Sequence, residues 1–409
     1  MPTKPKMIIA VSQVSTMATL AKDQAKFFVE HGFDVCILGK ADGTEQSVID
    51  EGAKFFNMDF RRSLSLFADF KTLVKLIKFF KREKPDAIQL MTLKPSFLGT
   101  MAGRLTGVPV IIRHKWGYLR ECNYKGIKRF LLFSADKFSN MLAHRVVAIC
   151  HKLLEAEVKV GAINPKKAIV FGSGSDNGVD LNRFKKTPEL VEKGKQIREK
   201  LQIWPTAPVL GTVMRINIEK GITELILAFR QLSEKYPNLR LIIVGEFDIR
   251  NLPDRDIIDE IKNNHQIHHV GFQKNIEDYF AAMDIFVMPS YREGFCKSNI
   301  EASSMELPVV STDIIGCSES VKDGVSGILV PSRTVQPLAD AIEKLLVDKE
   351  LAKKLGAQGR QRAENEFDQK FVWHNQLRDI CQLLKDKGIQ PPVEPETIIG
   401  SKCLRCSRG

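Results

Sequence analysis

Short apolar runs alternate with longer amphipathic stretches between residues 7 and 171. Runs of four to six apolar residues with helical segments between them are typical of a parallel sheet that is covered by helices on both faces. We therefore predict a Rossmann-like, doubly wound α/β domain over residues 1–185. Its predicted strands cover residues 7–11, 34–38, 53–56, 87–91, 108–112, 146–149 and 168–171, and its predicted helices cover residues 20–30, 65–82, 96–105 and 128–142.

The alternation is interrupted and then starts again. Residues 186–206 are charged and lack a strand pattern, so we predict a linker there. We expect a second Rossmann-like domain over residues 207–365, a helix over 366–388 and a disordered, proline-containing tail over 389–409. The predicted strands of this half cover residues 209–214, 239–244, 267–270, 285–288, 309–312 and 327–330, and its helices cover 221–235, 254–263, 276–282, 297–306, 336–346, 351–364 and 370–385.

Composition narrows the class of protein. The chain has 409 residues, enough for two or three domains, and no apolar run reaches the ~18 residues that a membrane-spanning helix needs. The start lacks a signal-peptide pattern, so we expect a cytoplasmic protein. The net charge of +12 points to nucleic acid or an anionic membrane as partner, although an alkaline enzyme without such a partner is equally compatible with it. Cys403 and Cys406 lie in a basic tail without a second pair, where we expect no metal site.

Residues 291–307 combine a turn with the start of a helix. They follow the predicted strand 285–288, Gly294 loosens the turn, and Ser298 or Asn299 is expected to cap the helix. The first main-chain N–H groups would then be unpaired at the positive end of the helix dipole, which suits a phosphate. These N–H groups belong to Phe295, Cys296, Lys297 and Ser298.

Four charged residues surround this expected phosphate site. Glu293 lies on the turn and Glu301 one turn into the helix, and a carboxylate there can accept both hydroxyls of a ribose. Arg215 and Lys220 follow the first strand of the second domain, and ligands of open parallel sheets gather at the carboxyl ends of strands. Both cations form charge-assisted hydrogen bonds with phosphate oxygens. The pattern therefore predicts a site for a nucleoside diphosphate.

The Glu-x7-Glu spacing of Glu293 and Glu301 resembles the signature of family 4 glycosyltransferases, retaining nucleotide-sugar enzymes of the GT-B fold. Arg215 and Lys220 fit the family's Arg-x4-Lys-Gly, whose cations hold the donor diphosphate. The resemblance implies two Rossmann-like domains that face a cleft, with a last helix that crosses back to the first domain. It also implies a base pocket whose residues here are Gly245, Phe272 and Gln273.

The first domain would supply the acceptor side. The resemblance suggests that His114, at the end of a predicted strand, contacts the donor sugar, although a lone histidine at a strand end is more often structural. The family's first loop is usually rich in glycine, and here it is not. The residues expected on the acceptor side are Ser12, Ser15, Thr16 and Lys115.

The implied reaction is transfer of a sugar from a UDP-sugar with retained configuration. Breaking the anomeric bond leaves negative charge on the diphosphate, which Arg215, Lys220 and the helix start would stabilise. Glu293 and His114 complete the expected catalytic set. The residues of the expected donor site include no Asp-x-Asp sequence, so we expect neither a metal nor a cofactor.

Basic residues lie at helical spacing beside aromatic ones in residues 67–82, and again in residues 124–133. Such a face can lie on an anionic leaflet, but it can equally belong to a helix that packs its apolar side on a sheet. The chain looks like bacterial enzymes that extend a sugar linked to polyprenyl diphosphate, often with an N-acetylhexosamine. We therefore expect a lipid-linked acceptor and peripheral association with the inner face of the cell membrane.

Two other classes of function remain open. A GT-B epimerase or hydrolase would act on a nucleotide sugar without an acceptor and would leave the basic first domain unused. A basic protein that binds nucleic acid would explain the charge but not the paired glutamates. A dinucleotide oxidoreductase is disfavoured because neither half has Gly-x-Gly-x-x-Gly after its first strand.

Overall fold

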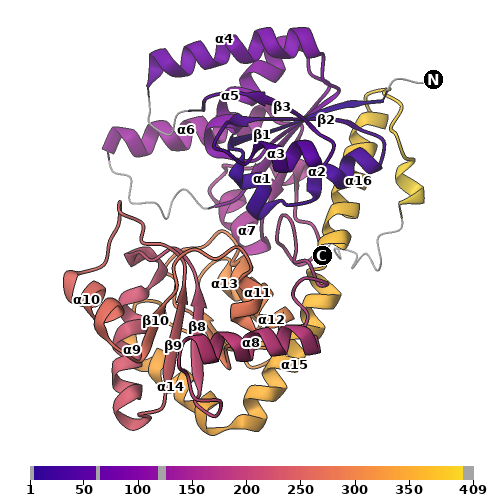
Figure 1. Ribbon diagram of the computed structural model, residues 1–409. Helices are drawn as coiled ribbons and strands as arrows, with labels where there is room; N and C mark the ends of the chain where they lie inside the picture. The colour runs from indigo at the N-terminus through magenta and orange to yellow at the C-terminus, as the bar shows by residue number, and fades with distance from the viewer. Residues whose placement is uncertain (1–3, 61–64, 118–125, 399–409) are drawn as a thin grey trace. The chain divides into compact units, whose positions relative to one another are not determined.

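The computed structural model describes residues 4–60, 65–117 and 126–398 (Figure 1). Its contacts divide the chain into two compact units. Unit 1 contains Met1–Asn177 together with the carboxyl-terminal segment from Lys370, and unit 2 contains Gly178–Gln369. Among the helices within the described ranges, none has the length and apolar character needed to cross a bilayer.

Unit 1 is built on a parallel sheet of seven strands in the order β3-β2-β1-β4-β5-β6-β7. The order reverses between β1 and β4, so the carboxyl ends of these two neighbouring strands border the point where open α/β sheets bind ligands. The strands are β1 (Lys6–Gln13), β2 (Asp34–Lys40), β3 (Lys54–Asn57), β4 (Ala87–Leu90), β5 (Val110–Lys115), β6 (Arg145–Ala148) and β7 (Ala168–Ile169).

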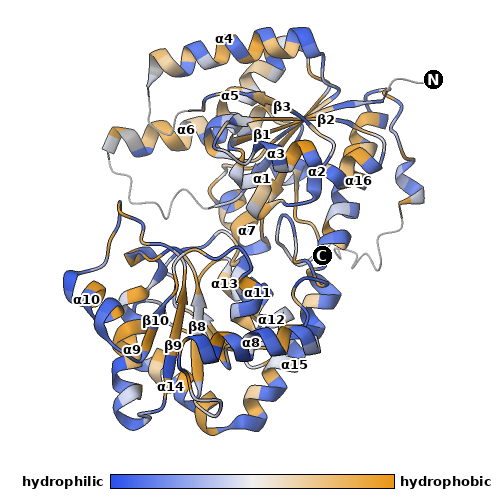
Figure 2. Ribbon diagram, in the orientation of Figure 1, coloured by the Kyte–Doolittle hydropathy of each residue, from blue (hydrophilic) through white to orange (hydrophobic). Residues whose placement is uncertain are grey.

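Successive side chains of each strand point to opposite faces of this sheet. Both faces are apolar, so helices cover both of them. Met7 and Ile9 of β1 join a core with Trp373 and Leu377, whereas Ile8 joins the core of the other face. Figure 2 shows the strands as mainly hydrophobic. The helices are α1 (Ser15–Leu20), α2 (Gln24–Glu30), α3 (Glu45–Asp50), α4 (Leu66–Glu83), α5 (Leu93–Thr106), α6 (Gly126–Leu142), α7 (His151–Lys159) and α16 (Gln369–Lys385).

Unit 2 repeats this design with six parallel strands in the order β10-β9-β8-β11-β12-β13. Its order reverses between β8 and β11. The strands are β8 (Val209–Val213), β9 (Arg240–Val244), β10 (Ile267–His269), β11 (Ile285–Met288), β12 (Val309–Thr312) and β13 (Gly327–Val330). The helices are α8 (Pro188–Lys200), α9 (Ile222–Lys235), α10 (Arg255–Asn263), α11 (Ile276–Phe280), α12 (Lys297–Ser304), α13 (Cys317–Ser320), α14 (Val335–Val347) and α15 (Lys349–Glu366). The predicted α/β class, with two doubly wound parallel sheets, is confirmed.

The expected linker contains a helix, α8, that packs on unit 2. The Thr187 side chain caps it by accepting a hydrogen bond from the Leu190 N–H at 3.2 Å, and Pro188 suits the first helical turn. Gly194 lies so close to α11 that an added Cβ would be 2.5 Å from the Ala281 carbonyl oxygen. The sequence pattern did not predict this helix, because the helix is rich in charged residues and buries few side chains.

The segment 389–398 is packed rather than disordered as far as residue 398. Ile398 is buried, and Ile389 and Val393 pack against the core of unit 1. Pro392 lies against Gly32, where φ is +90° and an added Cβ would be 2.9 Å from the proline Cβ. These three apolar residues, spread along the proline-containing segment, explain the difference from the expectation. The cysteines of the tail lie outside the described residues.

The amino-terminal helices also differ from the prediction. The helix expected over 20–30 begins only at Gln24, as α2, because Asp23 before it adopts a left-handed conformation with φ of 65°. Helix α1 already begins at Ser15, inside residues 12–16, which were expected to form the loop after the first strand. Thr16 is therefore helical, and its carbonyl oxygen accepts a hydrogen bond from the Ala21 N–H.

Candidate active site

The charged residues predicted to bind a diphosphate lie on two loops of unit 2 that follow adjacent strands. Arg215 and Lys220 follow β8, and Glu293 follows β11. Strands β8 and β11 are hydrogen-bonded neighbours at the point where the strand order reverses. The topology therefore brings both loops to the position where open α/β sheets bind ligands.

Lys220 and Glu293 form an ion pair between the two loops. The Lys220 ammonium donates to Glu293 Oε1, and the Ser290 hydroxyl donates to the same oxygen at 2.9 Å. The two charged side chains are 18% and 14% exposed, so the pair is sheltered but not sealed. Burial acts to lower the pKa of Lys220, but the Glu293 carboxylate acts in the opposite direction and prevails, so the pKa lies above the ordinary lysine value. Lys220 is therefore a fixed positive charge at neutral pH.

Hydrogen bonds to main-chain groups of both loops hold this pair in place. The Asn217 side chain accepts a hydrogen bond from the Lys220 N–H at 3.0 Å, and the Tyr291 N–H donates to the Glu219 carbonyl oxygen at 2.8 Å. Gly221 has φ of +71°, and an added Cβ would lie 2.0 Å from the Pro289 carbonyl oxygen. Only glycine permits this approach, which explains why a glycine follows Lys220.

Arg215 contacts a different carboxylate from the one that Lys220 binds. Its guanidinium forms an ion pair with Asp248 at 3.1 Å, and its side chain is 64% exposed. Hydrogen bonds from Arg250 lower the pKa of Asp248 to about 2, with a smaller contribution from the charge of Arg215. The structure thus joins Lys220 to Glu293, while Arg215 faces the loop after β9.

The start of α12 differs from the expectation in its capping. The helix begins at Lys297, after Cys296, and no side chain caps it. The Ser298 hydroxyl donates to the Val213 carbonyl oxygen at 3.1 Å, and the Asn299 amide donates to two serine hydroxyls. The Cys296 N–H faces the Gly316 carbonyl oxygen at 3.4 Å, so it is not free as predicted. Capping by Ser298 or Asn299 was therefore a wrong prediction, because both side chains tie the helix to neighbouring strands and turns.

Glu301 lies one turn into α12 and is buried. Its nearest cation is Lys297, whose Nζ is 3.8 Å from Oε1. Burial raises the pKa of Glu301 above the ordinary glutamate value, and the lysine reverses only part of this shift. Phe295, just before the helix, is buried against the ring of Phe367.

The residues of the expected base pocket have partners within the chain. The Phe272 N–H donates to Glu246 Oε1 at 3.0 Å, and the Gln273 amide donates to the Val270 carbonyl oxygen at 2.6 Å. The Phe272 ring itself is exposed. Gly245 has φ of +137° and lies against the Met214 carbonyl oxygen, so it joins the ends of β8 and β9.

In unit 1, Ser12 lies at the corresponding reversal of strand order. Its hydroxyl is 2.8 Å from the Thr92 hydroxyl, which follows β4. The Ser15 N–H donates to Asp42 Oδ2 at 3.0 Å. Ser12 is thus the residue of the expected acceptor side that lies between the ends of β1 and β4.

His114 ends β5 and is buried. Its Nδ1 lies 2.7 Å from Asp176 Oδ1. Its Nε2 has no hydrogen-bond partner among the residues that the structure describes. One ring nitrogen is therefore held by the protein, and the other remains for a ligand or water.

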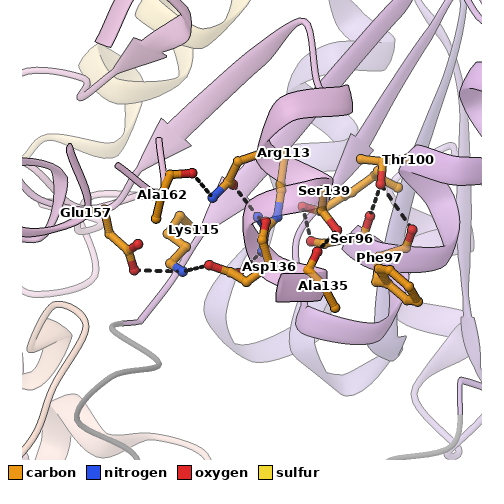
Figure 3. A network of polar contacts seen from close by, with 12 residues as sticks. Ser96, Phe97, Thr100, Arg113, Lys115, Ala135, Asp136, Ser139, Glu157 and Ala162 are labelled. Carbon is orange, nitrogen blue, oxygen red and sulfur yellow. Dashed lines mark hydrogen bonds and ion pairs between the residues drawn. The ribbon is translucent and has the colours of Figure 1, made fainter. Parts of the chain in front are cut away.

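Lys115 does not fit its expected place on the acceptor side. Its side chain is 3% exposed, and its ammonium binds the carboxylates of Asp136 and, at 2.8 Å, Glu157 (Figure 3). Arg113 binds the same Asp136. Burial acts to raise the pKa of Asp136, but the two cations more than reverse this effect, so the pKa is lower than usual.

The alternation of β5 explains the placement of Lys115. Residues 113 and 115 point to one face of the sheet, where α6 supplies Asp136, whereas His114 points to the face that carries α16. Two cations at alternate positions of an apolar strand indicate buried carboxylate partners, so the sequence pattern of β5 already favours a structural place for Lys115. Within the described ranges, no group of three or more His, Cys, Asp or Glu side chains could hold a metal ion.

Comparison with known proteins identifies the family. The family model described as "Glycosyl transferases group 1" matches residues 194–362, and the model described as "Glycosyl transferase 4-like domain" matches residues 15–174. The capsular polysaccharide biosynthesis glycosyltransferase CapM of Staphylococcus aureus is 30% identical over 371 residues, which are 90% of this chain and 95% of that protein. This chain is a group 1 glycosyltransferase.

The glycosyltransferase is also similar to a second bacterial enzyme. The UDP-Gal:alpha-D-GlcNAc-diphosphoundecaprenol alpha-1,3-galactosyltransferase of Escherichia coli is 26% identical over 322 residues, which are 78% of this chain and 81% of that enzyme. Among solved structures, Anabaena HepE in complex with UDP has a TM-score of 0.76 and 20% identity, and the match covers 93% of this chain and 100% of that one. The fold of the glycosyltransferase is thus GT-B, and the predicted resemblance is confirmed.

Proposed function

We propose that this glycosyltransferase moves a sugar from a UDP-sugar to a saccharide linked to polyprenyl diphosphate, with retained configuration and without a metal ion. The observation that carries the proposal is the sheltered Lys220–Glu293 pair at the reversal of strand order in unit 2. N-acetylhexosamines are the first donors to test. The expected context is synthesis of a bacterial surface glycan or glycoprotein, and the S. aureus relative, which is named for capsular polysaccharide, supports the first.

The donor would bind by its diphosphate. Lys220 is fixed by Glu293 in the position of a point charge, and the exposed guanidinium of Arg215 can turn to phosphate oxygens at little cost, because surface ion pairs are weak. Glu293 is then a positioning residue that acts through Lys220. Glu301 would accept hydrogen bonds from the ribose hydroxyls, and the N–H groups at the start of α12 would add a positive dipole.

The chemistry needs little more than charge stabilisation. The bond between the anomeric carbon and the diphosphate oxygen breaks, and the acceptor oxygen bonds to the same face of that carbon. The acceptor proton passes to a diphosphate oxygen, so UDP leaves as the product. Lys220 and Arg215 stabilise the charge that develops on this leaving group, and they take the part that a metal ion plays in other glycosyltransferases.

A membrane surface is a suitable location for such an acceptor, and unit 1 has features that fit one. Helices α4, α5 and α6 follow β3, β4 and β5, so their amino ends lie toward the carboxyl edge of the sheet. An ion pair between Lys94 and Asp69 joins the starts of α5 and α4. Large apolar side chains are exposed at these ends, with 83% exposure at Phe67. The others are Phe70, Ile127, Phe130 and Leu131.

The exposed charge on two of these helices, α4 and α6, is positive. The exposed residues of α4 and α6 that the structure describes include cations but no Asp or Glu. Each cation near an anionic leaflet contributes about 1 kcal/mol. These cations are Lys71, Lys75, Lys78, Lys81 and Arg82 on α4, and Arg129 and Lys137 on α6. Together with the apolar ends they favour peripheral binding at the inner face of the cell membrane.

The transfer reaction can be tested with a synthetic polyprenyl-diphosphate-linked N-acetylhexosamine and a panel of UDP-sugars. A thermal-shift screen first selects the donor, because a ligand of the folded state raises the melting temperature. We expect release of UDP that depends on the acceptor, and a product with the anomeric configuration of the donor by NMR. Epimerised or hydrolysed donor without acceptor dependence would contradict the proposal.

The membrane surface can be tested by sedimentation with phosphatidylglycerol vesicles. We expect binding at low salt and release at high salt, because the cations are exposed and therefore screened. Substituting Ile127→Ser together with Phe130→Ser should weaken binding, whereas Trp204→Ser, at an exposed apolar residue of unit 2, is the matched control. Absence of binding at every salt concentration argues against a membrane-bound acceptor.

A further inference from the structure

Asp176 lies between two side chains at alternate positions, His114 in β5 and Trp116 just after it. One carboxylate oxygen is 2.7 Å from His114 Nδ1, and the other accepts a hydrogen bond from the Trp116 indole N–H. The Gln376 amide of α16 donates to the Asp176 main-chain carbonyl oxygen. Asp176 and His114 are both buried, so these bonds are shielded from water.

The donors and acceptors in this cluster fix the position of one hydrogen atom. An indole nitrogen can only donate, so the second oxygen of Asp176 must accept. An ionised carboxylate has no hydrogen to give, so His114 must carry its hydrogen on Nδ1. A neutral imidazole in this form has a lone pair on Nε2, and Nε2 is the buried nitrogen without a partner among the described residues.

We propose that Asp176 is a positioning residue that holds His114 in the Nδ1–H form, so that Nε2 accepts a hydrogen bond from a hydroxyl of the sugar substrate. The inference rests on the proposed function, in which His114 contacts the sugar. It adds the residue that selects which ring nitrogen donates and which accepts. A buried nitrogen without a partner is costly, so a substrate hydroxyl that reaches Nε2 gains a hydrogen bond that the free protein lacks.

Trp116 makes the proposal testable with one substitution. In Asp176→Asn the amide has one acceptor and one donor group, and only the oxygen can satisfy the indole N–H. The amide NH2 then faces His114 Nδ1, so the imidazole must move its hydrogen to Nε2. In the double variant Trp116→Phe, Asp176→Asn the amide is free to turn its oxygen to Nδ1, and the original form can return.

The first measurement is the long-range ¹⁵N–¹H NMR spectrum of the full-length protein labelled at histidine nitrogen. We expect His114 to carry its hydrogen on Nδ1 in the wild type, on Nε2 in Asp176→Asn, and on Nδ1 again in the double variant. A spectrum of Asp176→Asn with the hydrogen still on Nδ1 overturns the proposal. Melting temperatures of the same samples establish that the variants are folded.

The second measurement is turnover with the donor found in the thermal-shift screen. Loss of the carboxylate that orients a metal-bound histidine costs on the order of 10–100-fold in activity. We expect a loss of similar size in Asp176→Asn and partial recovery in the double variant. In a His114→Ala background, Asp176→Asn should cost nothing further. An equal loss in that background overturns the proposal, because Asp176 would then act independently of His114.

The failure of the inference can be told apart from failure of the proposed function. If His114→Ala keeps full transfer activity, the glycosyltransferase reaction stands and the role of Asp176 in it is overturned. If the wild type transfers no sugar from any UDP-sugar, the proposed function fails, and with it the substrate contact. The NMR spectrum still decides whether Asp176 controls the form of the ring.

Discussion

One group of paired charges lies at strand ends in each unit, and the two groups differ in how completely they are enclosed. Lys220 and Glu293 in unit 2 form one pair with part of each side chain exposed. Lys115 in unit 1 contacts two carboxylates, Asp136 and Glu157, and all three side chains are almost fully buried. A cation that is oriented but still accessible can bind a ligand, whereas an enclosed one can only hold the fold together.

The largest effect should follow from breaking the enclosed group. Lys115→Ala leaves Asp136 and Glu157 with less positive charge in a buried position, and removing one partner of a buried ion pair costs roughly 3–5 kcal/mol of unfolding free energy. Chemical denaturation followed by circular dichroism measures this loss. Donor affinity of the folded fraction should not change, and a selective loss of activity with normal stability would return Lys115 to the active site.

Breaking the accessible pair should reduce catalysis instead. Lys220→Ala removes a positive charge aimed at the leaving group, and such a loss lowers turnover on the order of 10²–10³-fold. Initial rates at saturating donor measure the effect. Lys235→Ala is the matched control, because Lys235 forms an exposed pair with Glu343 elsewhere in unit 2. Kinetics like those of the wild type in Lys220→Ala would remove the site assignment.

Glu301 should make donor binding depend on pH. Burial raises its pKa, and only the ionised form accepts two ribose hydroxyls, so donor affinity should fall as the pH drops through this raised value. One proton accounts for a fall of at most about tenfold per pH unit. Calorimetric titration of UDP across the acidic range measures it, and Glu301→Ala should bind weakly at every pH.

The same shift predicts an effect of Glu301 on stability. The folded state holds the proton of Glu301 more tightly than the unfolded state, so stability is lost as the pH rises from the unfolded pKa through the folded pKa. Glu301→Gln should therefore be slightly more stable than the wild type at neutral pH while it binds UDP less well. A lower melting temperature of Glu301→Gln at neutral pH would contradict the desolvation argument.

The smallest stability effect is expected at Arg215. Its pair with Asp248 is exposed on the arginine side, and surface pairs contribute about 0.2–1 kcal/mol. Arg215→Ala should therefore keep its melting temperature within a few degrees while KM for the donor rises. An unchanged KM would leave Lys220 as the cation that carries diphosphate binding.

Much of the fold could be predicted from periodicity alone. Strands β11, β12 and β13 have the predicted bounds, because each is a short run of mainly apolar or β-branched residues between turn-forming segments. Helices α3, α7 and α8 were missed, and each of them buries only one or two residues. The family could be predicted because its signature consists of charged residues at fixed spacing.

The partners within the site could not be predicted in the same way. The pairing of Lys220 with Glu293 depends on the close approach of Gly221 to the Pro289 carbonyl oxygen, a contact between loops distant in sequence. Asp176 gains its importance from Trp116, which carries no charge and gave no signal. The catalytic and donor-binding roles of the named residues stay predictions until the variants are measured.

The alternation at the end of β5 places the imidazole of His114 and the ammonium of Lys115 on opposite faces of one sheet. Insertion or deletion of one residue in this strand would exchange the two faces, so that a cation would meet Asp176 and a ring would meet Asp136 and Glu157. A substitution in this strand changes one side chain and its contacts, whereas a change of length by one residue changes the contacts of His114 and Lys115 together.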